Sequence, residues 1–152
     1  MALQFVRHYN SRSSVNRSLG FGWSHTYDRY LTFSNGKILC HSEDGQVIYF
    51  PSDTLEAESG AREKLMHNEN GSYTLTTVDQ VKELYDSTGN LTSLTDLNGN
   101  TISLSYQNGR LSTVTDPFGR TLSFSYDTSG KITSISDPAG KTIQFGYDSS
   151  NN

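Results

Sequence analysis

Cysteine, proline and long apolar runs are all scarce in this chain of 152 residues. Cys40 is the single cysteine, which excludes an intrachain disulfide and a zinc site built on several cysteine ligands. No apolar run approaches the length of a membrane-spanning helix or of a signal-peptide core. We therefore expect neither a membrane span nor a signal peptide in this chain.

Strong charge of either sign is also missing, since charged residues make up 18% of the sequence and the net charge is −4. Residues 1–30 hold four arginines against one acid, Asp28, for a net charge of +3, and the remaining chain carries −7. Nucleic-acid binding needs clustered lysine and arginine to contact phosphates. Because most of the chain is acidic and the four arginines are spread out, we expect no nucleic-acid partner.

The abundant residues are those of strands and turns. Hydrophobic residues make up only 33%, but nine tyrosines and seven phenylalanines argue against a disordered chain. Thirteen glycines, together with many serines, threonines and asparagines, disfavour helices and favour β-strands joined by tight turns. The length suits one ordinary domain, so we predict an all-β fold.

The C-terminal half repeats with a period of 20 or 21 residues. The period is marked by Tyr85, Tyr106, Tyr126 and Tyr147, the last followed by Asp148. Each unit contains two turn signals. The first-type turns are residues 86–89, 107–109 and 127–130, with the defining residues Gly89, Gly109, Asp127 and Gly130. The second-type turns are residues 96–99, 116–119 and 137–140, with the defining residues Asp96, Gly99, Asp116, Pro117, Gly119, Asp137, Pro138 and Gly140.

Most of these turns have the sequence Asp-x-x-Gly, a pattern with a direct physical meaning. In a type I turn the Asp side chain accepts hydrogen bonds from the turn amides, and proline in the second position presets φ. Glycine in the fourth position adopts the left-handed conformation, which gives a common hairpin connection with a bulge. Two turns per unit leave strands of about six residues, so each unit is predicted to be one antiparallel β-hairpin.

The two strands of each hairpin differ in the spacing of their apolar residues. After the second-type turn, apolar residues alternate with polar ones, as over residues 122–126 and 143–147. This alternation places all the apolar side chains on one face of the strand. After the first-type turn the apolar residues lie three apart, as in Leu91 and Leu94. A regular strand sends such residues to opposite faces, so we predict a bulge or a sharp bend there.

Weaker copies of the same pattern run upstream of the repeat. Turn signals separate predicted strands over residues 30–33, 38–41, 46–50, 72–77 and 81–85. The polar, glycine-interrupted stretch over residues 52–64 is predicted to be a loop. We expect one sheet with an uncovered apolar face and two open edges. Because such surfaces associate, we expect a homo-oligomer, most simply a homodimer.

The Tyr-Asp-x-x-Gly repeat with its Asp-Pro-x-Gly turns resembles the YD repeat of the RHS (rearrangement hot spot) family, to which Tc toxin shells and teneurins are related. An N-terminal signature resembles the start of the RHS repeat region in bacterial proteins, and it comprises Tyr9, Asn10, Gly20, Gly22, Trp23, His25 and Tyr27. We accordingly divide the chain into an N-terminal segment with a Gly/Trp-rich plug (1–31), divergent early hairpins (32–84), three YD repeats (85–148) and a truncated end (149–152).

The resemblance implies an antiparallel sheet of hairpin repeats that curves and spirals into a hollow shell around a C-terminal toxin or effector domain. The partners that it implies are further repeats and that toxin domain, both in a longer parent protein that is secreted or held at the cell surface. This chain holds only a few units and no cargo. We therefore interpret it as a fragment of such a shell, without catalytic activity of its own.

Signals for chemistry are weak. Related proteins release their cargo by self-cleavage at a motif that contains Asp-Pro-x-Gly, but Asp116-Pro117 and Asp137-Pro138 match only the part that is also an ordinary turn. The histidines have no metal-ligand spacing, and His25 beside Ser24 lacks a nucleophile elbow. We expect no catalytic residue, no metal and no cofactor.

A glycan is the alternative partner. Trp23 and the series of repeat tyrosines are aromatic side chains, which either pack in the core or stack on sugars. The alternative function is therefore a carbohydrate-binding or cell-surface-binding β-repeat module.

Overall fold

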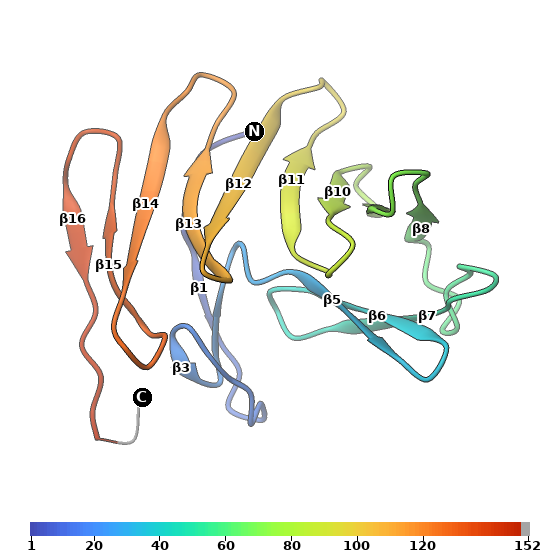
Figure 1. Ribbon diagram of the computed structural model, residues 1–152, viewed down its shortest axis with the longest axis horizontal. Helices are drawn as coiled ribbons and strands as arrows, with labels where there is room; N and C mark the ends of the chain where they lie inside the picture. Colours follow the sequence, from blue (N-terminus) through green and yellow to red (C-terminus); the bar gives the residue numbers. More distant parts are fainter. Residues whose placement is uncertain (150–152) are drawn as a thin grey trace.

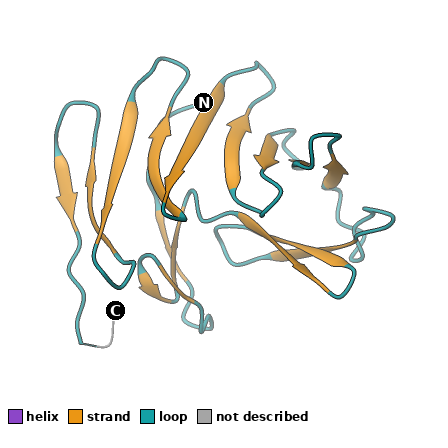
Figure 2. Cartoon of the chain, in the orientation of Figure 1, coloured by secondary structure: helices purple, strands orange, loops and turns teal. Residues whose placement is uncertain are grey.

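The computed structural model describes residues 1–149 and shows, within them, β-strands joined by turns and no helix (Figure 2). Nine consecutive strands form one antiparallel sheet in which each strand pairs with its neighbours along the chain (Figure 1). They are β8 (Lys64–His67), β9 (Tyr73–Thr76), β10 (Lys82–Tyr85), β11 (Leu91–Thr95), β12 (Thr101–Gln107), β13 (Arg110–Thr115), β14 (Thr121–Tyr126), β15 (Ile132–Ser136) and β16 (Thr142–Gln144). The predicted all-β class with antiparallel hairpins is confirmed.

The earlier strands form three smaller sheets, so the expectation of a single sheet is wrong. The pairs are β1 (Arg7–Tyr9) with β4 (Trp23–His25) and β2 (Asn16–Arg17) with β3 (Gly20–Phe21), and the third sheet contains β5 (Tyr30–Ser34), β6 (Lys37–His41) and β7 (Val47–Pro51). A loop over residues 52–63, close to the predicted one, separates β7 from β8, a strand that the sequence pattern missed.

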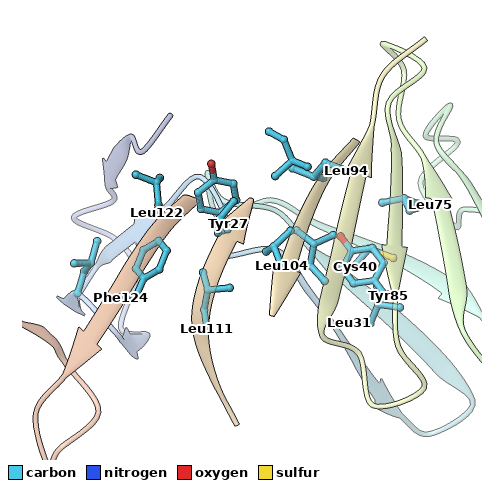
Figure 3. Packing of buried hydrophobic residues seen from close by; sticks show 14 of the residues in the cluster. Tyr27, Leu31, Cys40, Leu75, Tyr85, Leu94, Leu104, Leu111, Leu122 and Phe124 are labelled. Atoms are coloured by element: carbon cyan, nitrogen blue, oxygen red, sulfur yellow. The ribbon is translucent and has the colours of Figure 1, made fainter. Parts of the chain in front are cut away.

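The β5–β7 sheet packs on the nine-stranded sheet instead of extending it. Its inward side chains Leu31 and Cys40 belong to the same buried cluster as Tyr85 and Leu91 of the first repeat (Figure 3). Each apolar side chain of this kind contributes roughly 1.5–3 kcal/mol when it is fully buried. The two sheets therefore share one buried apolar core.

The hairpins of the repeat carry the bulge that the apolar spacing predicts. In the second repeat Tyr106 pairs with Leu111, but the preceding Ser105 pairs with Thr113, so Ser112 is an extra residue. The same register shift occurs in the first and third repeats. Because the bulge resets the alternation, Leu111 and Val114 both point into the core although they lie three residues apart.

The apolar face of the nine-stranded sheet is covered, contrary to the expectation of an open face. Met1, Leu3 and Phe5 of the N-terminal segment pack against the buried cluster. The ring centroid of Phe5 lies 5.8 Å from that of Phe124. Phe124 is a buried residue of β14 (Figure 3). The first residues of the chain therefore supply the second layer of the core.

The last predicted strand is only partly formed. Residues 143–147 alternate as predicted, but the strand β16 ends at Gln144, and Ile143 is 62% exposed. The reason is position: within residues 1–149, β16 is the last strand of the sheet and pairs on one side only. Residues 150–152 of the predicted truncated end lie outside the described residues. Within residues 1–149, no helix is long and apolar enough to span a membrane.

Candidate functional site

The repeat tyrosines point inward and bind the backbone of the preceding hairpin. The hydroxyl–carbonyl pairs are Tyr106 Oη to Leu91 at 2.9 Å, Tyr126 Oη to Leu111 at 2.7 Å and Tyr147 Oη to Ile132 at 2.7 Å. Each acceptor carbonyl belongs to the residue just before the extra residue of a bulge. A bulge disrupts the ladder of backbone bonds locally, and the next tyrosine supplies a donor there.

These hydroxyls are structural donors and remain protonated. Burial raises the pKa of Tyr106, and it raises the pKa of Tyr126 to about 12. Tyr85 differs, because its hydroxyl donates to the Glu83 carboxylate rather than to a carbonyl, and burial raises its pKa as well. Tyr85, Tyr106 and Tyr126 of the series are therefore directed toward the core.

The turn aspartates hold backbone amides. Asp116 Oδ1 accepts the N–H groups of Phe118 and Arg120, each at 2.9 Å, and its other oxygen accepts from the Arg120 guanidinium at 2.7 Å. Burial alone would raise the pKa of Asp116, but the Arg120 side chain and the turn amides lower it. The same bonds to the second and fourth following amides are made by Asp86, Asp96, Asp127 and Asp137.

The turns also use their glycines and prolines as predicted from turn geometry. Pro117 and Pro138 occupy second positions, and the fourth-position glycines Gly89, Gly99, Gly119, Gly130 and Gly140 all have φ between 80° and 95°. The first-type turn of the second repeat, residues 107–109, is one residue shorter than the others. It differs because Asn108 and Gly109 both have positive φ, at 51° and 74°. That combination is typical of a two-residue hairpin loop. Asp148 lies beyond β16, outside any strand.

The N-terminal segment docks on the first-type turns through backbone bonds. Leu31 N–H donates to the Gly89 carbonyl at 2.8 Å, next to a bridge between Tyr30 and Asn90. Farther along the sheet, Ile132 N–H donates to the Ser18 carbonyl at 2.8 Å. The approach at Gly89 is so close that a Cβ atom there would collide with the Leu31 carbonyl.

A cluster of charged residues lies under this docked segment. Arg29 pairs with Glu83 of β10 and, at 2.5 Å, with Glu43 of the β6–β7 turn. Burial lowers the pKa of Arg29, but the two carboxylates outweigh it and raise the pKa overall. Arg17 Nε bonds Asp28 Oδ1 at 3.2 Å. The two Arg29 pairs tie the N-terminal segment to the β6–β7 turn and to β10 of the nine-stranded sheet, and the Arg17–Asp28 pair lies within the N-terminal segment.

Sequence reasoning missed the Arg29 cluster, although one signal for it exists. Glu83 stands between Val81 and Tyr85, in a position where the alternation calls for an inward apolar side chain. An acid in such a place requires a buried cationic partner. The identity of that partner, Arg29, is not readable from the sequence.

His25 is buried in the same region as a neutral ring. Its Nδ1 accepts the Tyr27 N–H at 3.2 Å, and its Nε2 lies 3.5 Å from Asp28 Oδ2. Burial is the main cause that lowers the pKa of His25. Ser24 Oγ donates to the Glu43 carbonyl and not to His25, so these neighbours in sequence do not form a triad. Tyr27 is buried and donates its hydroxyl to the Gln4 carbonyl at 2.7 Å.

Four further residues of the N-terminal signature, Tyr9, Asn10, Gly22 and Trp23, line a cleft of about 710 Å³ between residues 7–17 and the β6–β7 turn. Trp23 lies in it with its ring centroid 4.9 Å from that of Tyr9. Gly22 is required there, because a Cβ atom would lie 2.7 Å from the Asn10 carbonyl oxygen. Gly20 is buried in β3 beside it and also has positive φ.

No metal-binding group emerges from the described residues. Across residues 1–149, no three His, Cys, Asp or Glu side chains gather in a way that could hold an ion. His41 stacks on Tyr30 at 4.3 Å, His67 stacks on Tyr73 at 4.5 Å, and His8 lines the cleft. Cys40 is buried, and burial raises its pKa to about 12, so it is not a thiolate at neutral pH.

Two family models match the chain. The RHS Repeat model matches residues 85–121, 107–138 and 126–152, which is the stretch with the tyrosine period. A domain of unknown function, DUF6531, matches residues 1–50, which hold the signature residues and the strands up to β7. The curated proteins contain no match to the chain.

Proposed function

The chain belongs to the RHS-repeat family, and from that premise we propose that it is part of the wall of a shell that encloses a toxin or effector domain in a longer parent protein. In this proposal the chain is a structural element with no catalytic role. The parent protein works outside the cell or at its surface, as RHS-repeat proteins generally do.

The observation that carries the proposal is the way the sheet grows. Every 20 or 21 residues add one hairpin with the same pairing, the same bulge and the same tyrosine bond to the hairpin before it. A sheet that grows in this way can be extended by further hairpins of the same kind. Among the strands that the structure describes, β16 has a neighbour on one side only, and it bears the exposed Ile143, where a further hairpin would find its partner.

The chemistry of the repeat supports a structural role. The carboxylates of Asp116 and Asp137, which precede the prolines, accept turn amides and serve as turn formers. A carboxylate engaged in this way is a poor nucleophile or general base, because deforming the turn is the cost of releasing it.

The proposal is tested on the complete protein encoded around this chain. We expect further Tyr-Asp units after residue 152, followed by an unrelated domain that resists protease while the repeat is folded. Limited proteolysis of the full-length protein, followed by mass spectrometry, measures the cleavage rate of that domain in buffer and in urea. The domain should become cleavable in the same urea range in which the repeat unfolds.

A destabilised variant is the control. Gly89→Ala destabilises the folded repeat and leaves the sequence of the downstream domain unchanged. The downstream domain should therefore lose its resistance to protease at a lower urea concentration. A downstream domain that is digested at full rate while the repeat remains folded would contradict the proposal, and so would the absence of any further repeats.

A further inference from the structure

The three first-type turns lie along the same edge of the nine-stranded sheet (Figure 1). Backbone bonds join the N-terminal segment to the first repeat at Gly89 and to the third repeat at Ile132. In the described part of the chain, no backbone hydrogen bond joins that segment to residues 107–109, the turn of the second repeat. The backbone bonds of the N-terminal segment therefore flank the second repeat and leave it out.

The glycines of the three turns show the same difference. Gly89 is buried against the Leu31 carbonyl, and a Cβ atom at Gly130 would lie 3.2 Å from the Arg110 guanidinium. Gly109 is exposed, and a Cβ atom there would meet nothing within 4 Å. Because the turn of the second repeat is one residue shorter than the other two, we attribute the open space beside Gly109 to the missing residue.

A cavity of about 140 Å³ lies between this short turn and the N-terminal segment. Gly109 and Arg110 line it on the side of the turn, and Arg17, Ser18 and Arg29 line it on the side of the segment. The volume exceeds the roughly 30 Å³ that one water molecule occupies in the liquid. It is well below the roughly 300–1,000 Å³ of pockets for drug-sized ligands, so the cavity suits a ligand of a few heavy atoms.

Two buried polar atoms belong to residues that line this cavity. Within residues 1–149, Ser18 Oγ and Arg29 Nε are the buried side-chain atoms that have no hydrogen-bond partner. The other two nitrogens of Arg29 donate to the carboxylates of Glu83 and Glu43. A buried donor without an acceptor is unfavourable because its desolvation is not compensated. Both atoms therefore call for an acceptor that the chain itself does not supply.

The charged groups of the lining favour an anion as that acceptor. Arg17, Arg29 and Arg110 are cationic, and Asp28 is the acidic residue among the lining residues. Both oxygens of Asp28 are already engaged, Oδ1 by Arg17 Nε and Oδ2 by the His25 N–H, each at 3.2 Å. A water molecule brings as many donors as acceptors, whereas an anion brings acceptors alone. The wall has a surplus of donors, which matches the anion.

We propose that the cavity binds a small inorganic oxyanion of the phosphate or sulfate type. The ion accepts hydrogen bonds from Arg29 Nε and Ser18 Oγ and lies against the Arg110 guanidinium. Arginine suits such a ligand because its N–H groups form charge-assisted hydrogen bonds with phosphate oxygens. The ion joins the N-terminal segment to the second repeat, where the backbone bonds are missing. The proposal does not depend on the role of the parent protein.

Urea unfolding tests the proposal, because an ion that binds only the folded chain raises the urea midpoint in a saturable way. The probe is inorganic phosphate at neutral pH, with the ionic strength held constant by sodium chloride. We expect the midpoint to rise and level off as phosphate replaces chloride. The Arg29 Nε–H signal in ¹⁵N–¹H NMR spectra should move over the same range of concentration.

Phosphate also stabilises proteins by exclusion from their surface, but that effect grows steadily with concentration and displaces no single side-chain signal. Equal midpoints in phosphate and chloride, or an Arg29 signal that does not move, would show that the cavity holds water alone. Either result would overturn the proposal.

Matched variants locate the site. Arg110 and Arg62 are both exposed, but only Arg110 lines the cavity. Arg110→Gln should weaken the apparent affinity for phosphate about threefold or more, whereas Arg62→Gln should leave it unchanged. Equal effects of the two substitutions would contradict binding in this cavity.

A longer turn tests the origin of the cavity. Replacing residues 107–109 by Asp-Thr-Ser-Gly, the sequence of residues 127–130, gives the second repeat the turn length of its neighbours. The added residue should fill the gap and abolish the saturable response to phosphate in a chain that remains folded. A folded variant that still responds like the parent chain would overturn the assignment of the ion to this gap.

Discussion

Two glycines with the same backbone conformation have different surroundings. Gly89 and Gly99 close successive turns with φ of 95° and 81°. A Cβ atom at Gly99 would meet nothing within 4 Å, whereas one at Gly89 would collide with the carbonyl of Leu31. Gly99 is therefore needed for conformation alone, and Gly89 for conformation and for docking.

Alanine at these two positions separates the contributions. We expect Gly99→Ala to lower the free energy of unfolding by about 1–2 kcal/mol, the usual cost of a left-handed non-glycine residue. Gly89→Ala should cost at least about 3 kcal/mol, because the Leu31 strand must also move. Urea unfolding measures both. Equal losses at the two positions would show that the docked contact adds nothing to stability.

His25 makes stability depend on pH. Its Nδ1 accepts a hydrogen bond, and its pKa in the folded protein is lowered from the usual 6.5, mainly by burial. The unfolded chain therefore binds a proton that the folded chain excludes. The contribution of neutral His25 is fully present above pH 6.5 and is lost as the pH falls below that value.

We accordingly expect the urea concentration at the midpoint of unfolding to decrease as the pH is lowered from 7 to 5. His25→Asn, which keeps an acceptor near the Tyr27 amide but cannot be protonated, should remove most of this slope. His41 is the control, because its pKa is also lowered by burial but it lies half-exposed on Tyr30. A slope that survives in His25→Asn and disappears in His41→Asn would contradict this assignment.

At the scale of the element, each hairpin tolerates variation in its turn but not in its strands. The second repeat is one residue shorter, and the missing residue is taken from the first-type turn. The pair of positive-φ residues Asn108 and Gly109 closes the shorter loop. The bulge and the tyrosine pairing beyond the loop remain as in the other repeats. Register is preserved because one slipped residue would turn the apolar face outward.

Different elements are joined by the buried Arg29 cluster. Glu83 has a side chain only 4% exposed, and Arg29 also bonds Glu43. Glu83→Gln removes one charge of a buried pair and should cost about 3 kcal/mol. The exposed pair of Lys37 and Glu58 is the matched control, and Glu58→Gln should change stability by less than about 0.5 kcal/mol. Similar small effects of both substitutions in urea unfolding would contradict a role for the cluster in joining the sheets.

At the scale of the whole molecule, the sheet is closed on one face and open at its last strand. The N-terminal segment and the β5–β7 sheet cover the apolar face (Figures 1 and 3). The edge of β16 is not covered by another strand of the described chain. Unprotected edges of this kind pair with other chains.

We predict that the isolated chain self-associates through β16. Size-exclusion chromatography with light scattering at micromolar concentrations should show a species larger than a monomer. Ile143→Lys places a charge on the exposed edge strand and should shift the protein to monomer. Leu97→Lys is the control, because Leu97 is exposed at a turn tip away from the edge strand. A monomeric parent chain, or an equal effect of both variants, would contradict association through this edge.

Much of the repeat could be predicted from the sequence because its causes are local. An Asp-x-x-Gly turn is formed by bonds within five residues, as at Asp116. The spacing of Leu91 and Leu94 implies the bulge because strand alternation has a strict period of two. The hairpins and their turns therefore follow from residues close together in the chain.

Only the tertiary structure decided what covers the hairpins. Arg29 meets Glu83 and Ser18 meets Ile132 across long stretches of chain, and many alternative pairings have the same local pattern. The choice among them depends on burial of apolar area and on pairing every buried charge, which are properties of the packed molecule as a whole. For that reason the sequence determined the hairpin ribbon, and the fold alone determined that its first residues turn back to form the second layer, the charged cluster and the cleft.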